Sequence, residues 1–339
     1  MKVLHVHEKF WPYNGGSTTR LLNLIDTSNN KHYVLARKHC DLLKNVQKLN
    51  HIVIIRYKSD FDLVKLIMHF FLNRKIDIFH IHNLRASFLF LPFLIFSRKN
   101  ILELHSIYLP RNRMKKLISK FATYFYKNIL LLSSSSKSLF NDNFWGKPKI
   151  TVVENGVSLS RFKFNRNLTG NIKICYVGSL KEFQGVDRFV EIANLIKRHD
   201  MEFHIYGGTT SEIEELKRLD MEGKVQFHGQ IQYSEVHHIY AQMDAMLMTR
   251  PKMKSTDSAI PIKPLEALSV GLDVFSTDVG GMREVDSILN TDKLKIMSND
   301  KLVHSLNVYQ RNNKHQVVDL SYFDKVTKTK QLEDIYKRL

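Results

Sequence analysis

Short runs in which apolar and polar residues alternate recur along the chain, and stretches with helical spacing of apolar residues separate them. Alternation predicts half-buried strands, whereas apolar residues three and four positions apart predict helices. In the first half, the predicted strands are residues 2–7, 33–36, 52–56, 76–82, 101–105 and 130–134. Strands that alternate with helices in this way predict a parallel sheet covered by helices on both faces.

The same rhythm restarts in the second half, after a polar stretch at residues 163–171 that predicts a linker. Here residues 172–177, 203–208, 243–248 and 273–277 are predicted strands, and residues 186–198 and 234–241 are predicted helices. A chain of 339 residues with 43% apolar content is long enough to bury two cores. We therefore expect two α/β domains.

Residues 260–284 predict a helix, a buried strand and a glycine turn. Pro264 suits the first helical turn, and Gly271 suits the helix end. A helix N-terminus beside the Gly280-Gly281 turn would favour a bound phosphate. Glu266 lies near that N-terminus, where its carboxylate could accept hydrogen bonds from two hydroxyls of a sugar. A helix-capping glutamate and an ordinary loop would explain the same residues.

Other polar positions allow two readings each. Residues 11–19 form a glycine loop between a strand and a helix, which suits either phosphate binding or a plain turn. His105 would lie where a strand ends at the ligand-binding edge of such a sheet. His80 and His82 share one strand face, where hydrogen bonds commonly satisfy histidines. Asp60 and Asp62 follow Ser59 at a helix start, which favours a helix cap over a metal site.

Charge is distributed very unevenly. The formal net charge is +18; residues 1–165 contain 27 Lys/Arg and 9 Asp/Glu, whereas residues 166–339 contain 24 of each. Within 111–127, an apolar stripe predicts packing against the sheet and a lysine face predicts solvent exposure or contact with anionic lipid. RNA or DNA binding would need an exposed sheet, and these strands are predicted to be buried.

Targeting and redox signals are few. The two cysteines, Cys40 and Cys175, have no metal-ligand or disulfide spacing, which suits a reducing compartment. Residues 1–10 are too short and polar for a signal peptide, and the longest apolar run, residues 88–96, is too short to cross a bilayer. We expect a cytoplasmic protein, peripheral on the inner face of the cell membrane.

Several of these motifs, in order along the chain, resemble the GT4 family of retaining glycosyltransferases. They are the glycine loop at 11–19, Asn155-Gly156-Val157 followed by Phe162, the helix of Glu266 with Gly280-Gly281, and a terminal helix at 331–339. The resemblance implies the GT-B fold: two Rossmann-like, parallel-sheet domains facing a cleft. It implies an acceptor-binding domain at 1–165, joined by a crossing helix at about 321–339, and a nucleotide-sugar-binding domain at 166–320.

The resemblance also implies site residues. His105 would position the donor sugar and Glu266 would hold the ribose, so these two are the catalytic candidates. The implied donor-binding residues are Gly15, Gly16, Gly178, Lys181, Gly207, Gln230, Ile231, Ser258, Lys263, Leu265, Gly280 and Gly281. The sequence departs from the family at Ser179, Gln184 and Ser258, where an arginine, a lysine and a glutamate are usual. Lys181 and Lys263 are the nearest cations that could compensate at the diphosphate.

The implied reaction moves a sugar from a nucleoside diphosphate, with UDP expected, to a hydroxyl of a lipid-linked or surface-polysaccharide acceptor, with retention and without a metal or other cofactor. The expected partners are the nucleotide sugar, the acceptor and an anionic membrane surface, and no nucleic acid. Two alternatives remain open. One is a catalytically impaired GT-B protein that acts as a binding module, and the other is a GT-B sugar-nucleotide epimerase.

Overall fold

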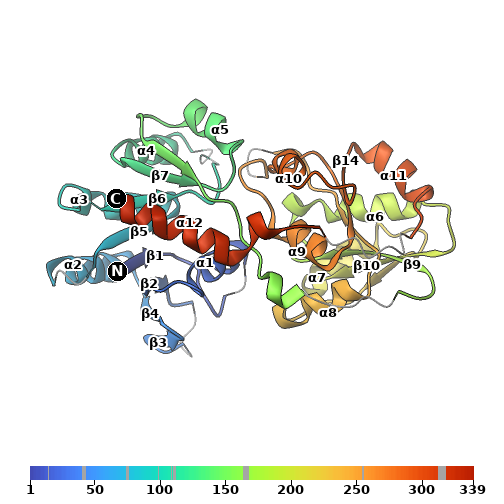
Figure 1. The fold of residues 1–339 in the computed structure, drawn as a ribbon, viewed down its shortest axis with the longest axis horizontal. Coiled ribbons are helices and arrows are strands. Elements are labelled where there is room, and N and C mark those ends of the chain that lie inside the picture. Colours follow the sequence, from blue (N-terminus) through green and yellow to red (C-terminus); the bar gives the residue numbers. More distant parts are fainter. Residues whose placement is uncertain are drawn as a thin grey trace. The chain divides into compact units, whose positions relative to one another are not determined.

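The protein is seen in a computed structural model that describes residues 1–13, 15–39, 43–73, 76–97, 99–107, 109, 112–162, 168–253, 256–311 and 318–339. The chain divides into two compact units (Figure 1). Unit 1 consists of Met1–Gly156 and Phe323–Leu339, and unit 2 consists of Val157–Tyr322. Cys40, Arg111, Lys254 and residues 163–167 of the predicted linker lie outside the described residues.

Unit 1 is built on a sheet of eight strands. They are β1 (Lys2–Val6), β2 (Lys31–Arg37), β3 (Val46–Leu49), β4 (Ile52–Tyr57), β5 (Ile78–His82), β6 (Asn100–Glu103), β7 (Asn128–Leu131) and β8 (Lys149–Val152). Their order is β3-β4-β2-β1-β5-β6-β7-β8, and every pair is parallel except β3 with β4. The helices are α1 (Gly16–Ile25), α2 (Asp60–Leu72), α3 (Asn83–Leu94), α4 (Arg113–Tyr124), α5 (Ser136–Asn143) and α12 (Lys325–Arg338).

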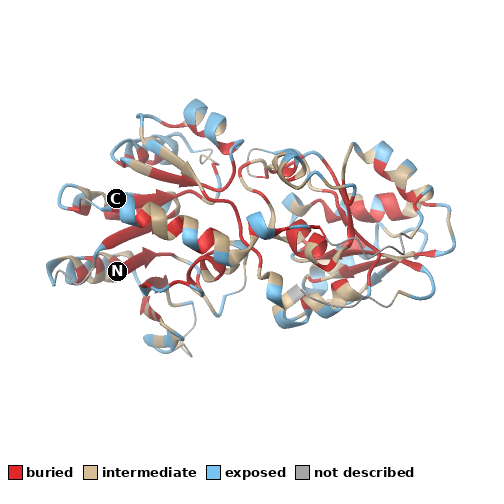
Figure 2. Cartoon of the chain, viewed as in Figure 1, coloured by how far each residue is buried: buried red, intermediate tan, exposed pale blue. Residues whose placement is uncertain are grey.

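The two faces of this sheet pack against different helices. Val3 packs in a core with residues of α1 and α12, whereas its neighbour Leu4 packs in a second core with residues of α2 and α3. This division follows from the two-residue period of a strand. His5 therefore shares the α1 and α12 side with Val3, and this is the side on which the histidines of β1 and β5 gather. Figure 2 shows that burial is continuous along the central strands.

Unit 2 contains a second, fully parallel sheet of six strands. The strands are β9 (Ile172–Val177), β10 (Met201–Tyr206), β11 (Val225–Phe227), β12 (Ala245–Met248), β13 (Asp273–Ser276) and β14 (Leu294–Ile296), in the order β11-β10-β9-β12-β13-β14. The helices are α6 (Val186–Leu195), α7 (Thr210–Lys217), α8 (Val236–Ala241), α9 (Ile262–Val270), α10 (Met282–Leu289) and α11 (Asn299–Asn307). Apolar residues of α6 and α11 pack on this sheet.

Local signals in the sequence place several helix ends correctly. Ser59 and Asp62 form a reciprocal capping box at the start of α2, as predicted, and Asp60 pairs with Arg37 and Arg85. The helix of Glu266 is α9, and it ends at Gly271 in the left-handed conformation. Several elements had no prediction, namely the strands β3, β8, β11 and β14 and the helices α5, α7, α10 and α11.

The prediction for α4 was wrong. Its apolar stripe is exposed, with exposed fractions of 66% for Met114 and 50% for both Leu117 and Phe121. The helix instead buries Ser119, Ala122 and Thr123. Small side chains let α4 pack closely against α3, with which it is in contact, and the Thr123 hydroxyl is satisfied by the helix's own carbonyls. Helical spacing identifies an apolar face, but it does not show that the face is covered.

The observed division of the chain also differs from the predicted one. The sequence placed the boundary after residue 165, whereas the structure changes units after Gly156. The difference arises because the 3-10 helix Leu159–Phe162 is in contact with α9 of unit 2. In the described part of the chain, no helix has both the length and the apolarity that a membrane span requires.

Candidate functional site

The carboxyl edge of β9, β10 and β11 brings three glycine-containing segments of unit 2 together. The Gly178 amide donates to the Tyr206 carbonyl, and the Gly207 amide donates to the Gly229 carbonyl. A side chain at Gly207 would overlap the Gly178 carbonyl, so the close approach of these two loops requires glycine there. Gln230 follows at the same edge and is exposed. The predicted base-binding segment, Gln230 and Ile231, is thus adjacent to Gly207.

Helix α9 supplies two ionisable side chains to the site. Lys263 reaches Gly178, and its Nζ donates to the Tyr176 hydroxyl at 2.7 Å and to Gln184 Oε1 at 3.3 Å. One helical turn further, Glu266 is 4% exposed, and its Oε1 accepts a 2.6 Å hydrogen bond from the Tyr233 hydroxyl. Spacing of three residues on one helix puts both groups on the same face. The neighbouring Leu265 is fully buried and packs in the core.

Burial shifts the pKa of both groups in the direction that favours the uncharged form. Burial raises the pKa of Glu266 to about 7, although the Tyr233 hydroxyl, Lys263 and Arg161 act in the opposite direction. Burial likewise lowers the pKa of Lys263 to about 7; nearby Arg250 adds to the shift and Glu266 opposes it. An acid and a base that both titrate near neutral pH are typical of functional sites, because each can change charge when a ligand binds.

The loop before α9 contains a carboxylate that the sequence analysis did not single out. Asp257 Oδ1 accepts a 3.1 Å hydrogen bond from the Gly280 amide, which the resemblance had assigned to sugar or phosphate. Gly280 has a φ of +58°, and a side chain there would collide with the Thr256 and Ala259 carbonyls. Ser258, next to Asp257, is fully buried. The Gly280 amide therefore donates to Asp257 in this structure and not to a ligand. Gly281, the next residue, is the N-cap residue of α10.

The side chain of Lys181 does not lie beside that of Lys263 at Gly178. Its side chain is 65% exposed and its Nζ lies 3.0 Å from Glu212 Oε1 on α7. Such exposed pairs contribute little to stability, and this one directs the amino group away from Gly178 towards α7. Arg250, by contrast, is close enough to Lys263 to influence its pKa. Of the two lysines suggested as substitutes for the usual cations, only Lys263 reaches Gly178.

In unit 1, His105 is held by a buried carboxylate at the end of β6. His105 Nε2 lies 3.0 Å from Glu103 Oε1, and Glu103 is completely buried. The same oxygen accepts a 2.8 Å hydrogen bond from Arg20 Nε. Burial opposes ionisation of Glu103, but Arg20 and the surrounding histidines outweigh it and hold the pKa of the carboxyl well below its usual range. An ionised carboxylate can only accept a hydrogen bond, so Nε2 of His105 carries the ring proton and donates it to Glu103.

A chain of buried histidines extends from His105 across the sheet. His105 Nε2 lies 3.1 Å from His82 Nδ1, His82 Nε2 lies 3.1 Å from His5 Nδ1, and His5 Nε2 lies 2.9 Å from His32 Nδ1. Burial lowers the pKa of His5 and His82 well below the usual value and that of His32 to about 3, so these rings are neutral. The Tyr336 hydroxyl lies 2.6 Å from His80 Nδ1.

Two sets of three histidines have ring nitrogens close enough together to hold a metal ion, namely His5 with His80 and His82, and His7 with His82 and His105. A hydrogen bond between rings accounts for one short distance in each set, between His5 and His82 and between His82 and His105. The one buried carboxylate beside them, Glu103, is balanced by Arg20. A divalent ion would add two positive charges to a buried cluster that is neutral without it, which is unfavourable.

The predicted glycine loop of unit 1 lies at the start of α1. Gly15 precedes the helix in an extended conformation, and Gly16 is its first residue. A Cβ on Gly16 would meet no atom of the described structure within 4 Å. The helix start is therefore open, which leaves room for a ligand there but does not by itself require glycine.

Comparison with known proteins supports one family. Residues 171–302 match the family model of glycosyl transferases group 1. This matched region lies within unit 2, which is therefore similar to group 1 glycosyltransferases. Over its whole length the chain also has the GT-B fold of solved glycosyltransferase structures. A search of curated proteins gave no match.

Three similar solved structures illustrate the fold. Sucrose-phosphate synthase from Thermosynechococcus elongatus has a TM-score of 0.78 at 12% identity, covering 99% of this chain and 98% of that one. HepE from Anabaena in complex with UDP-glucose has a TM-score of 0.77 at 15% identity. The lipopolysaccharide outer core galactosyltransferase WaaB has a TM-score of 0.71 at 17% identity. Coverage is 100% of both chains in the last two cases.

Sequence reasoning missed several residues that the structure places at these sites. They are Arg20, Glu103, Arg161, Tyr176, Tyr233 and Asp257. Glu103 did carry a signal, because an acid between apolar residues of a buried strand needs a partner. Tyr233 carried none, since its contact with Glu266 depends on how two distant segments fold together.

The first prediction concerns Glu103. In Glu103→Gln, Arg20 stays buried without a counter-ion, so we expect the free energy of unfolding to fall by about 3 to 5 kcal/mol. Tyr336→Phe is the matched control: it removes one hydrogen bond of the histidine cluster but keeps the carboxylate, and should cost about 1 kcal/mol. Urea unfolding followed by circular dichroism measures both. Equal losses in the two variants would contradict an anchoring role for Glu103.

Proposed function

We propose that this protein is a glycosyltransferase of the GT4 type that moves a sugar from a nucleoside diphosphate, UDP in the first instance, to an acceptor hydroxyl. The observation that carries the proposal is the pair of half-buried Lys263 and buried Glu266 on α9, inside the region that matches group 1 glycosyltransferases. The complexes of HepE with UDP and with UDP-glucose support the choice of nucleotide.

Each residue of the pair has a proposed role. Glu266 accepts hydrogen bonds from the ribose hydroxyls, and Tyr233 keeps its carboxylate oriented. Lys263 faces the diphosphate across Gly178, with Arg250 nearby, so these two cations replace those absent at Ser179 and Gln184. Charge that develops on the leaving diphosphate is stabilised by such preorganised cations. Lys263 and Gly178 thus form the centre of the proposed phosphate subsite.

The proposed stereochemical outcome is retention. A double displacement needs a carboxylate nucleophile near the anomeric carbon. The Glu266 carboxylate already accepts a hydrogen bond from the Tyr233 hydroxyl, and the Asp257 carboxylate accepts one from the Gly280 amide. A front-face route, in which the leaving diphosphate helps to deprotonate the acceptor, needs no such nucleophile. His105, oriented by Glu103, would hold a sugar hydroxyl through its second ring nitrogen. We propose that the transfer itself uses no metal.

The acceptor is proposed to be lipid-linked or a surface polysaccharide, with unit 1 bound peripherally to an anionic membrane. Helix α4 supports this: its large apolar side chains are exposed, and four basic residues accompany them. The basic residues are Arg113, Lys115, Lys116 and Lys120. No acid occurs between residues 104 and 141. An apolar face flanked by cations suits insertion among anionic lipid headgroups.

Nucleotide binding is the primary test. Thermal unfolding with UDP, GDP and ADP should show a shift with one nucleotide, since a ligand at 100 times its dissociation constant adds about 2.7 kcal/mol to stability. Glu266→Ala should abolish that shift, whereas Glu191→Ala, at an exposed position on α6, should keep it. A protein that no nucleotide or UDP-sugar stabilises would be the impaired binding module instead of an enzyme.

The pH dependence of nucleotide affinity follows from the two shifted groups. Glu266, with its pKa raised to about 7, is charged above pH 7 and accepts hydroxyl hydrogen bonds best there. Lys263, with its pKa lowered to about 7, is charged below pH 7 and attracts the diphosphate best there. Affinity measured by calorimetry should therefore peak near neutral pH and fall on both sides. Glu266→Gln should remove the acid limb and Lys263→Met the alkaline limb; an unchanged profile would count against both roles.

Membrane docking predicts that the protein sediments with vesicles that contain phosphatidylglycerol. Leu117→Ser with Phe121→Ser should weaken binding by about tenfold or more, because each buried apolar side chain contributes about 1.5 to 3 kcal/mol. Lys115→Gln with Lys116→Gln should reduce the salt dependence of binding. Met221→Ser, at an 84% exposed position of unit 2, is the control. Equal binding by all variants would exclude α4 as the docking surface.

A further inference from the structure

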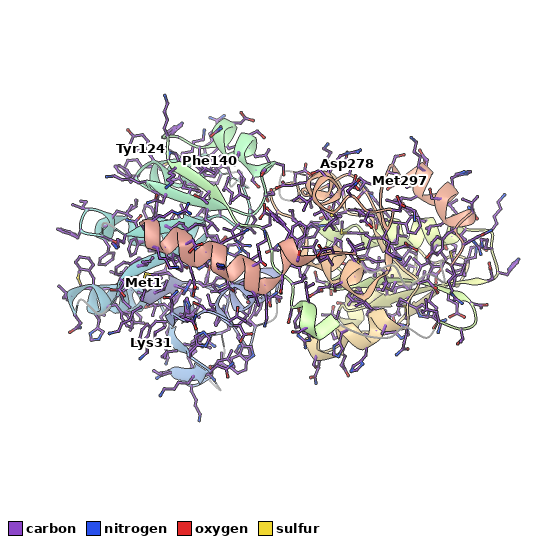
Figure 3. All side chains as sticks on the ribbon, viewed as in Figure 1. Met1, Lys31, Tyr124, Phe140, Asp278 and Met297 are labelled. Atoms are coloured by element: carbon purple, nitrogen blue, oxygen red, sulfur yellow. The ribbon has the colours of Figure 1, made fainter. Side chains whose placement is uncertain are left out.

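A second polar cavity lies at the carboxyl edge of the unit 2 sheet. Its volume is about 440 Å³, and its walls come from α6 and from the segments that follow β12, β13 and β14. Figure 3 labels two of the lining residues, Asp278 and Met297. Gly178, Lys263 and Glu266 are not among the lining residues. The cavity therefore does not include the pair of ionisable residues on α9, although Arg250, which acts on Lys263, is one of its lining residues.

The walls of this cavity are strongly basic. Five of the lining residues are cations and one is an acid; the cations are Arg188, Arg250, Lys252, Arg283 and Lys301. The acid, Asp278, is already paired with Arg283, with 3.0 Å between Oδ2 and Nε. Residues 166–339 contain equal numbers of basic and acidic residues, so this excess is local to the cavity. A concave basic site of this kind attracts an anion.

Most of these cations have no partner within the protein. Arg188, Lys252 and Lys301 make no hydrogen bond or ion pair with another described residue. Arg250 Nε is buried without a hydrogen-bond partner, and burial lowers the pKa of this guanidinium. A buried charge is costly unless an opposite charge accompanies it. A bound anion would supply that charge.

The start of a helix adds further donors. Ser298 and Asn299, at the start of α11, line the cavity, and no side chain caps this helix. The first backbone amides of a helix lack carbonyl partners and carry a partial positive charge. Phosphate oxygens are suitable acceptors for such amides and for the planar fork of an arginine. Amides, guanidinium groups and ammonium groups thus line the same cavity.

We propose that this cavity binds a phosphate dianion, either free phosphate or the phosphate group of a sugar phosphate. A volume of about 440 Å³ accommodates either ligand. Arg250 is the one lining residue that is also assigned to the nucleotide sugar, so the test changes Arg188 and Lys301 instead. Occupancy would compensate the buried charge of Arg250 and stabilise unit 2.

The test measures thermal unfolding in potassium phosphate, in glucose 6-phosphate, and in potassium chloride at equal ionic strength. The variant Arg188→Gln/Lys301→Gln removes two lining cations. Lys217→Gln/Arg218→Gln, at exposed positions in α7 and just after it, removes the same charge elsewhere in unit 2. Phosphate should stabilise wild type and the control, and its affinity should fall about tenfold or more in the lining variant. The UDP-induced shift should be the same in all three proteins.

Three results would overturn the proposal. If phosphate and chloride stabilise wild type equally, or if the lining variant responds like the control, the basic residues bind ions only non-specifically. If UDP displaces bound phosphate, the cavity is part of the nucleotide site and not a separate one. A larger shift with glucose 6-phosphate than with phosphate identifies a sugar phosphate as the ligand, and equal shifts identify free phosphate. Loss of UDP binding alone would count against the proposed transferase site and leave this proposal standing.

Discussion

Unit 1 depends on the ion pair between Glu103 and Arg20, both of which are almost completely inaccessible to solvent. Arg20 belongs to α1 and also donates to the carbonyls of Val153 and Glu154, so one side chain joins a helix, the end of β6 and the segment after β8. The Glu154 carboxylate in turn accepts from Lys328 of α12, at 2.9 Å. Two buried cations and two buried carboxylates thus compensate one another. Removing any one would leave an isolated charge in an apolar core.

The ion pair of Glu103 and Arg20 also helps to explain why the neighbouring histidines are neutral. With Glu103 ionised and Arg20 beside it, further positive charge in the cluster is unfavourable, and burial already favours neutral rings. Each neutral imidazole has one donor and one acceptor, so a hydrogen-bonded row of them has a definite direction. Ionised Glu103 sets that direction, because it can only accept. The ring of His105, the most exposed member at 11%, takes its orientation from this buried row.

The strands and most helices follow directly from the sequence, because alternation and helical spacing report burial within a single element. Helical spacing also placed Glu266 on its helix. Because Gly271 marks the end of that helix, Glu266 had to lie before its last turn. The orientation of α4 could not be predicted, since whether Leu117 is covered depends on what packs beside it. Likewise, the position of Lys181 depends on Glu212 of another helix. The roles of Tyr233 and Asp257 depend on contacts between distant segments, which local patterns do not encode.

The chain leaves unit 1 at Gly156 and returns to it at Phe323, so unit 2 is an insertion within unit 1. Tyr336 and Lys328, which complete the buried network of unit 1, follow the whole of unit 2 in the chain and are synthesised after it. During translation, unit 2 can therefore reach its native state first, although most of unit 1 precedes it on the ribosome. Until α12 emerges, the side of the first sheet that carries His80 and Glu154 remains uncovered. That side is where a nascent chain would need protection by a chaperone.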